Sequence, residues 1–239
     1  MTALKEQGRR YAIVDAVSDA HLLDIGAAAA GHALITGGSG VAIGLPENFR
    51  QAGLLPVLDD PGRLPVVGGH AAVLAGSCSR ATLFQIANAR GHVPTLELDA
   101  LATPDAAALA AQALAWMQDR LGDTPVVIAA SAPPEKVAAL QARLGREAAG
   151  LLIETALAEI AHALVAAGVR RLVVAGGETS GAVVRRLGVR RLRIGAEIDP
   201  GVPWTFAEGG EASLKLALKS GNFGAPDFFL KSFAMPEAA

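Results

Sequence analysis

The chain has 239 residues, of which 51% are hydrophobic and 18% are charged, and its formal net charge is −2. A chain of this length can bury a core as one large domain or two smaller ones, and so apolar a composition excludes disorder over most of it. The 21 Lys and Arg residues against 23 Asp and Glu residues argue against a general nucleic-acid-binding protein, which carries a basic excess.

Cysteine usage and the N-terminus indicate the compartment. Cys78 is the only cysteine in the sequence, which excludes an intrachain disulfide and favours a reducing cytoplasm. Residues 1–16 lack the apolar core of a signal peptide. No apolar run is expected to approach the length of a membrane span, so the sequence predicts a soluble cytoplasmic protein without a membrane partner.

The first stretch of the chain predicts alternating strands and helices. Residues 11–14 and 33–36 are short apolar runs that predict strands. Ser18 is the predicted N-cap of a helix between them, and a glycine turn with a helical turn follows over residues 37–45. The order strand, helix, strand, glycine loop and helix is typical of a parallel α/β sheet.

A segment rich in proline and glycine follows over residues 47–69. Because these residues interrupt both helical and strand periodicity, the segment is predicted to be a linker. The predicted organisation is therefore a first segment over residues 1–46, the linker, and a domain over residues 70–239.

From residue 70 onward the alternation is regular. Strands are predicted at residues 71–75, 95–98, 126–130 and 172–175, with shorter ones at 191–196, 204–207 and 213–218. Helices are predicted at residues 80–90, 105–121, 135–168 with a break near 145–149, and 227–233. The predicted fold class is a three-layer α/β fold, with a mostly parallel sheet flanked by helices and glycine loops at the carboxyl ends of strands.

The stretch Arg171–Gly188 holds the most informative turn. An apolar run over residues 172–175 stops at Gly176 and Gly177, and a helix begins within three residues. A glycine turn before a helix lets the backbone approach a ligand, and the helix start presents unpaired N–H groups that favour a phosphate or carboxylate. Such turns also occur for purely structural reasons. The spacing fits neither a P-loop nor a dinucleotide fingerprint, so this turn alone identifies no ligand.

Three polar glycine loops follow predicted strands, at residues 76–79, 176–181 and 219–224. The carboxyl ends of parallel strands line a common crevice, so these loops can converge. Glycine N–H groups and serine and threonine hydroxyls would suit a polyphosphate. Lys219 could add positive charge there, although a solvated lysine is equally compatible with the sequence.

Other candidate chemistry is sparse. The five histidines lack the spacing of metal ligands, so no metal site is predicted. Cys78 lies at a predicted helix start, where a lowered thiol pKa would permit nucleophilic catalysis, but no histidine base is evident. Glu178 opens the helix after the central glycines. It could hold Mg²⁺ beside a bound phosphate, or it could only stabilise the helix start.

The sequences of the three loops resemble a known family. VLAGSCSRAT at residues 73–82, VVAGGETSGAVV at 173–184 and LKSGNFG at 218–224 resemble the C-terminal nucleotide-binding domain of the four-carbon acid sugar kinase family. Residues 11–26 and 36–46 resemble the stretch that precedes that domain, so the resemblance covers nearly the whole chain.

The resemblance implies a reaction and a set of ligand contacts. Kinases of this family use ATP to phosphorylate a terminal hydroxyl of a sugar acid of the 3-oxo-tetronate, threonate or erythronate type. The residues that would hold ATP, with Mg²⁺ as its counterion, are Ser77, Gly177, Glu178, Thr179, Ser180 and Gly221. The catalytic residues remain unassigned. Phosphoryl transfer relies mainly on positioning and charge neutralisation, which glycine loops and Mg²⁺ can supply.

The chain departs from the family in one respect. Family members are longer and carry an early Asp-Asp motif in an N-terminal sugar-acid domain, whereas Asp59 and Asp60 lie in the predicted linker. We therefore expect a C-terminal portion of a kinase that binds ATP but phosphorylates little alone, because the acceptor would be oriented by the missing domain. The alternatives are a non-catalytic, effector-like nucleotide-binding protein and an enzyme that uses Cys78. A homodimer through strand 213–218 or through the face left by the missing domain is left open.

Overall fold

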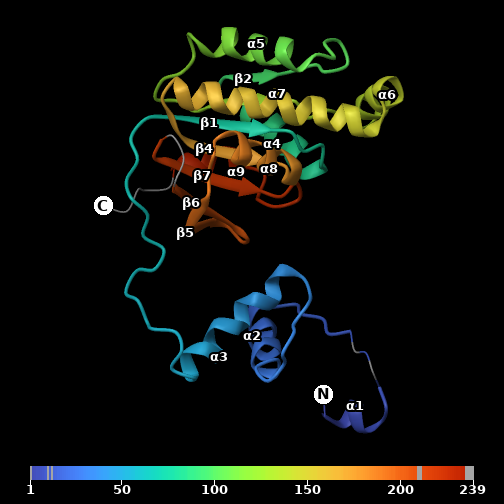
Figure 1. Ribbon diagram of the computed structural model, residues 1–239, viewed down its shortest axis with the longest axis vertical. Coiled ribbons are helices and arrows are strands. Elements are labelled where there is room, and N and C mark those ends of the chain that lie inside the picture. Colours follow the sequence, from blue (N-terminus) through green and yellow to red (C-terminus); the bar gives the residue numbers. More distant parts are fainter. Residues whose placement is uncertain (1, 10, 12, 209–211, 235–239) are drawn as a thin grey trace. The chain divides into compact units, whose positions relative to one another are not determined.

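The computed structural model describes residues 2–9, 11, 13–208 and 212–234. The chain divides into two compact units, Met1–Asp60 and Pro61–Ala239. Figure 1 shows the elements of each unit, which are described separately below.

The first unit is helical. It contains α1 (Thr2–Glu6), α2 (Asp19–Ala28), the 3₁₀ helix η1 (Ser39–Gly44) and α3 (Leu45–Gln51). Ser18 caps α2 as predicted, because its side chain accepts a hydrogen bond from the N–H of His21. The side-chain amide of Asn48 in α3 donates a 2.8 Å hydrogen bond to the carbonyl oxygen of Gly26 in α2. This bond and the close approach of Gly26 to Gly44 hold the helices together.

Both strands predicted in the first unit are wrong. Residues 33–36 and the described residues of 11–14 form no strand, and residue 12 lies outside the described part. A strand needs a neighbour that accepts and donates its backbone hydrogen bonds, and an apolar run alone cannot supply one. Tyr11 and Ile13 are 94% and 96% exposed. The start of the predicted linker is also ordered, since α3 reaches Gln51.

The second unit is built on one seven-stranded sheet. Its strands are β1 (His70–Ala75), β2 (Thr95–Glu97), β3 (Val126–Ala129), β4 (Val169–Ala175), β5 (Arg191–Asp199), β6 (Val202–Glu208) and β7 (Leu214–Lys219). The order across the sheet is β2-β3-β1-β4-β7-β6-β5. The first five strands in this order are parallel, and β6 and β5 are antiparallel additions. The predicted α/β fold with a mostly parallel sheet is confirmed.

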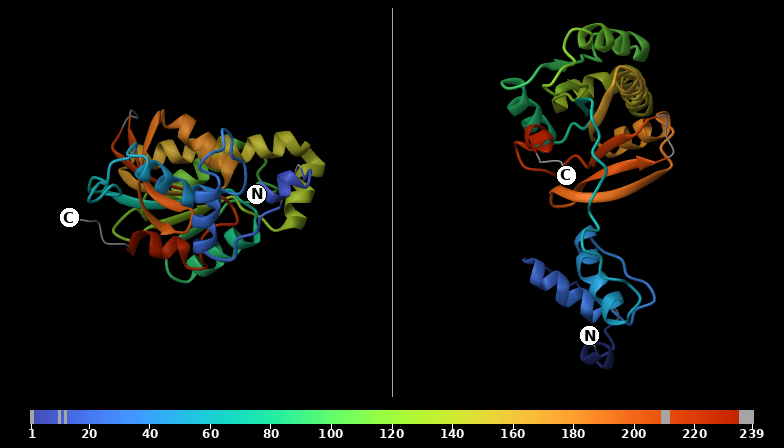
Figure 2. Two further views of the ribbon diagram at one scale, coloured as in Figure 1. Left: turned by 90° about the horizontal axis from the view of Figure 1, so that it is seen from below. Right: turned by 90° about the vertical axis from the view of Figure 1, so that its left-hand side faces the viewer.

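Helices cover both faces of the sheet (Figure 2). They are α4 (Arg80–Arg90), α5 (Ala106–Met117), α6 (Pro134–Leu144), α7 (Arg146–Ala166), α8 (Gly177–Arg186) and α9 (Phe228–Ala234). Successive strand residues point to opposite faces, so Leu74 joins the core under α5, α7 and α8, whereas Val73 joins the core under α4 and α9. Burial on both faces explains why β1, β3 and β4 end in uninterrupted apolar runs.

The strand that the sequence left open as a dimer contact lies inside the sheet. β7 pairs with β4 over residues 215–219 on one side and with β6 over residues 214–216 on the other, so it is not an edge strand of the sheet. The two lysines on this strand, Lys215 and Lys219, are buried. The sequence placed the strand correctly but did not reveal its neighbours.

Helix α7 contradicts the expectation about apolar length. It has 21 residues and a mean hydropathy of 1.5 over its most apolar window, and within the described ranges it is the one helix that could cross a membrane by length and composition. In the fold it is a core helix. Leu157, Ile160 and Leu164 are fully buried against the sheet and its neighbouring helices.

Candidate functional site

The three glycine loops meet because the strands that precede them are neighbours. Strands β1, β4 and β7 are adjacent and parallel, so their carboxyl ends lie at one edge of the sheet. The backbone joins the loops directly: the N–H of Ser77 donates to the carbonyl oxygen of Ala175 at 3.1 Å, and the N–H of Gly176 donates to that of Lys219 at 2.8 Å. Residues separated by more than 140 positions therefore share one site.

Glycine is required where the loops touch. Gly176 has φ +130° and ψ 132°, a conformation that residues with a side chain rarely adopt. A Cβ atom there would lie 2.9 Å from Oγ1 of Thr179 and 3.2 Å from the backbone nitrogen of Ser77. A side chain at Gly221 would collide with Oγ of Ser77. Ser77 and Thr179 thus meet at Gly176, and Gly221 packs against the other side of the contact, at Oγ of Ser77.

The two helices that begin at these loops differ at their amino termini. Helix α4 is capped by its own sequence, since Oγ of Ser79 accepts a hydrogen bond from the N–H of Thr82 at 3.2 Å. Helix α8 has Gly176 as its N-cap and no capping side chain. The N–H groups of its first turn, together with the positive end of the helix dipole, are available to an anion.

One face of α4 holds the third loop. Thr82, Gln85 and Asn88 lie three residues apart and face the same way. Oγ1 of Thr82 donates to the carbonyl oxygen of Gly221, and the side-chain amide of Gln85 donates to the carbonyl oxygens of residues 223, 224 and 225. Asn88 donates to the carbonyl oxygen of Pro226. The helix therefore fixes the path of the loop between β7 and α9.

Lys219 lies beneath the loops and is fully buried, so it is not the solvated lysine that the sequence also allowed. Its ammonium donates hydrogen bonds to Oγ1 of Thr82 at 3.1 Å and to the carbonyl oxygens of Ser220 and Gly221 at 3.1 and 3.0 Å. Burial disfavours the charged form and lowers the pKa of Lys219 to about 8.

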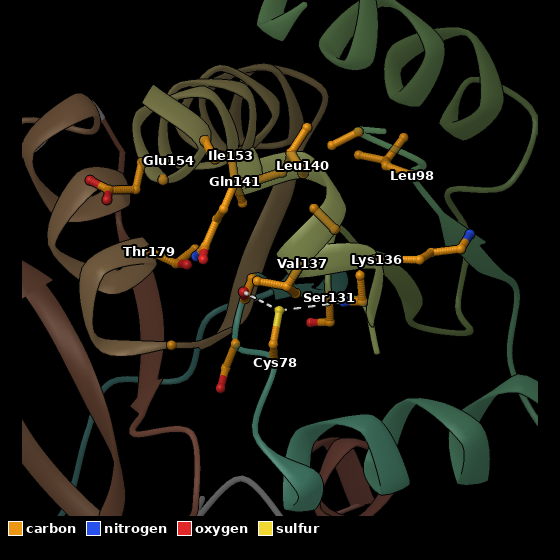
Figure 3. A pocket seen from close by; sticks show the side chains of 18 of the residues that line it. Cys78, Leu98, Ser131, Lys136, Val137, Leu140, Gln141, Ile153, Glu154 and Thr179 are labelled. Atoms are coloured by element: carbon orange, nitrogen blue, oxygen red, sulfur yellow. Dashed lines mark hydrogen bonds between the residues drawn. The ribbon is translucent and has the colours of Figure 1, made fainter. Parts of the chain in front are cut away.

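A pocket of about 730 Å³ opens beside the loops. Figure 3 shows its two sides: the loop residues Cys78, Ser131 and Thr179, and an apolar region between α6, α7 and the end of β2. The apolar side chains are Leu98, Val137, Leu140 and Ile153. A volume of this size is typical of a site for a small organic ligand, and its lining combines the apolar region with polar and charged side chains.

The predicted site residues take different places around this pocket. Ser77, Gly177, Glu178 and Thr179 line it. Ser180 is buried within α8, and its hydroxyl oxygen has no hydrogen-bond partner among the described residues. Gly221 does not line the pocket but packs against Ser77.

Comparison with known proteins assigns the second unit to a protein family. Residues 72–229 match the family model described as the nucleotide-binding C-terminal domain. The chain belongs to this family. The resemblance of its loops to four-carbon acid sugar kinases is also confirmed, because the curated relatives named below are such kinases.

Curated relatives named 3-oxo-tetronate kinase are 54% identical over 231 residues in Cupriavidus necator, 55% over 230 in Pseudomonas fluorescens and 37% over 235 in Salmonella typhimurium. These matches cover 96%, 96% and 97% of this chain but 52%, 53% and 55% of the relatives. The chain thus spans about half the length of the curated relatives it matches.

Two solved structures share the fold. A Haemophilus influenzae protein is 37% identical with a TM-score of 0.70, and a Salmonella typhimurium LT2 protein described as a candidate tRNA synthase is 36% identical with a TM-score of 0.75. The matches cover 98% and 97% of this chain, and 55% and 54% of the solved chains.

Sequence reasoning missed the apolar half of the pocket in this family domain. Leu98 is the first residue after β2 and Ser131 the second after β3, so the rule that used strand ends to place the glycine loops could also have found them. Val137, Leu140 and Ile153 lie on α6 and α7 and have the spacing of ordinary core residues. No local signal separates them from the core.

Charged residues line the outer part of the pocket. Lys136 forms a 2.8 Å ion pair with Asp99, and the hydrogen bonds from this lysine and from the N–H of Ala102 lower the pKa of the Asp99 carboxyl. Both side chains are about half exposed. An exposed ion pair of this kind contributes little to stability. Its position at the pocket is therefore more informative about ligand binding than about folding.

The chemistry suggested for Cys78 lacks a base. Its thiol is exposed, and Sγ lies 3.4 Å from the backbone nitrogen of Ala132. No histidine is among the pocket-lining residues of the described chain. Across the same ranges, no group of three or more His, Cys, Asp or Glu side chains could hold a metal ion.

Proposed function

We propose that this chain binds ATP at the edge of the sheet where β1, β4 and β7 end. The observation that carries the proposal is the convergence of Ser77, Thr179 and Gly221 beside the uncapped start of α8. The triphosphate would lie against Ser77 and the first turn of α8, over Gly177, Glu178, Thr179 and Ser180. Backbone N–H groups and hydroxyls are the donors that phosphate oxygens need.

The apolar region of the pocket supports a nucleoside rather than a free polyphosphate. Leu140 and Ile153 offer the apolar surface on which a purine base can be buried. Gln141 lines the same pocket and could hydrogen bond to the base or the ribose.

Mg²⁺ would enter with the nucleotide. Glu178 is exposed in the first turn of α8 and lines the pocket, which suits a carboxylate that holds Mg²⁺ together with phosphate oxygens. The bound cation would neutralise charge on the phosphates during transfer. The residues present therefore fit a magnesium nucleotide.

The reaction would be phosphorylation of a four-carbon sugar acid of the 3-oxo-tetronate, threonate or erythronate type. The names of relatives up to 55% identical support this substrate class. The role of this chain would be to hold and orient the phosphoryl donor in the cytoplasm, without nucleic-acid or membrane partners. A catalytic base is unassigned.

Phosphorylation would require the part of the kinase that this chain does not span. Orientation of an acceptor against a bound donor can lower a barrier by roughly 7–11 kcal/mol, and this contribution would come from the sugar-acid domain. The first unit would adjoin that domain. Its large apolar side chains Ile13, Leu34 and Val57 are more than 80% exposed, as expected of a surface that packs against further protein. A homodimer would be a second way to cover it, and the molar mass in solution tests that state.

Two measurements test the proposal. Calorimetric titration of the chain with ATP and Mg²⁺ should show saturable binding, and the Gly221→Val variant should bind at least ten-fold more weakly. Sugar-acid-dependent ADP release should be absent for the chain alone and appear when a separately expressed sugar-acid domain of a relative is added. ADP release by the chain alone would refute the requirement for that domain.

A non-catalytic nucleotide-binding protein is the second candidate. It predicts ATP binding but no phosphorylation after the sugar-acid domain is added. The Cys78 enzyme is disfavoured by the lack of a pocket histidine, and full activity of a Cys78→Ala variant in the reconstituted kinase would exclude it.

A further inference from the structure

The residue that the proposed function leaves unexplained is Lys219. It is among the largest fully buried side chains, and it ends β7 at the centre of the three loops. In the described part of the chain no carboxylate forms an ion pair with it. A buried ammonium without a counterion is costly, and the hydrogen bonds of Lys219 to neutral groups do not supply an opposite charge.

The hydrogen bonds of Lys219 help to fix the direction of two successive peptide groups, together with the N–H of Phe223 on the first and the hydroxyls of Ser79 and Thr82 on the second. Its ammonium donates hydrogen bonds to the carbonyl oxygens of Ser220 and Gly221. In a trans peptide the C=O and the following N–H point in opposite directions, and no peptide bond in the described ranges is cis. The N–H groups of Gly221 and Asn222 are therefore directed away from the lysine, toward the outer side of the loop.

These two N–H groups are free to bind a ligand. Neither donates a hydrogen bond to any described residue, and both residues are at least partly exposed. Successive backbone N–H groups that point the same way form a concave anion-binding nest. Gly221 also packs against Ser77, which places the nest beside the loop after β1.

A purely structural clamp does not require a charge here. Gln85 lies on the same helix as Thr82. Its neutral amide already donates hydrogen bonds to three successive carbonyl oxygens of this loop. An amide could satisfy the Ser220 and Gly221 carbonyls in the same way. What an ammonium adds is a positive charge behind the nest, in surroundings that screen it poorly.

We propose that Lys219 is a positioning residue for the phosphates of the bound nucleotide. It aims the N–H groups of Gly221 and Asn222 at the terminal phosphates, and its buried charge attracts them without direct contact. This inference rests on the proposed nucleotide function. It predicts that Lys219 contributes to phosphate binding but not to nucleoside binding.

The test compares ADP with adenosine, each titrated calorimetrically into the full chain. For the Lys219→Met and Lys219→Gln variants we expect the dissociation constant of ADP to rise at least ten-fold and that of adenosine to change by less than two-fold. Lys219→Gln keeps hydrogen-bond donors without the charge, so it also decides the question if Lys219→Met does not fold. Lys215→Met is the matched control, because Lys215 is buried on the same strand away from the loop, and it should leave the ratio of the two constants unchanged.

The outcomes separate this inference from the proposed function. If both Lys219 variants bind ADP as the unmodified chain does, or lose ADP and adenosine in parallel, Lys219 is structural and the inference is wrong. If the unmodified chain binds neither ADP nor adenosine, the proposed nucleotide function itself fails, and the inference fails with it.

Discussion

Oγ of Ser79 donates a 2.6 Å hydrogen bond to the carbonyl oxygen of Gly221, a residue 142 positions later in the chain. Ser79 also caps α4, so one hydroxyl joins the start of a helix to the loop after β7. Oγ1 of Thr82 and the ammonium of Lys219 bind the same carbonyl oxygen. The shape of the candidate phosphate site thus depends on contacts beneath the loops as much as on residues that would touch the ligand.

A variant of Gly221 tests the close approach of the loop after β7 to the loop after β1. In a Gly221→Val variant the side chain would collide with Oγ of Ser77 and push the loops apart. We expect at least a ten-fold loss of ATP affinity, measured by calorimetric titration. Gly91→Ala, at the other end of α4, is the control, since a Cβ there meets no atom within 4 Å. Equal ATP affinity for the two variants would contradict the convergence at this point.

A variant of Gln85 tests whether this residue holds the loop after β7 in place. The residue is 1% exposed, and its side-chain amide donates to three carbonyl oxygens. A Gln85→Leu variant would leave the carbonyl oxygens of Phe223 and Gly224 without a donor, whereas that of Ala225 keeps the N–H of Phe228. We expect the free energy of unfolding in urea to fall by about 2–4 kcal/mol. Asn88→Ala removes one exposed bond of the same helix face and should cost less than about 1 kcal/mol. Similar losses for the two variants would show that Gln85 does not hold the loop.

Lys219 makes stability depend on pH in a defined window. Its pKa is about 8 in the folded chain against an ordinary 10.5, so between these values the unfolded chain binds a proton that the folded chain does not. The free energy of unfolding should therefore rise as pH increases from 8 to 10.5, by up to about 3 kcal/mol, whereas below pH 8 the full cost of the buried charge is present. Subtracting the same curve for Lys219→Met removes the contribution of other groups. A flat difference between the curves would contradict the buried charge.

The exposed ion pair at the pocket should behave differently. Lys136 and Asp99 are about half exposed, so Lys136→Met should leave the stability of the chain nearly unchanged. Thermal melts of the variant and the unmodified chain measure this directly. A larger loss would mean that the pair braces α6 against the end of β2.

The sequence predicted the parallel strands of the second unit because apolar, β-branched runs alternate there with helices and glycine turns. It could not predict the order β1-β4-β7, which alone brings residues 77, 179 and 221 together. Alternation at residues 213–218 identified β7, but whether Lys219 is solvated or buried depends on α4, which packs over it.

The strands predicted in the first unit failed for a related reason. Apolar runs at residues 11–14 and 33–36 have the composition of strands, yet no neighbouring strand is present in the described part of the first unit. Local patterns therefore identified strands correctly where a neighbouring strand is present to pair with them, and wrongly where none is present in the described residues. The apolar side of the pocket was missed because its residues have the same pattern as the core.

The central claim is that one nucleotide is held by three loops from distant parts of the chain, and the most direct measurement is a crystal structure of the chain soaked with a non-hydrolysable ATP analogue and Mg²⁺. We predict density for the triphosphate in contact with Ser77, with the first turn of α8 and with the N–H groups of Gly221 and Asn222. Density for the phosphates away from these loops, or contact with one loop alone, would contradict the proposed site.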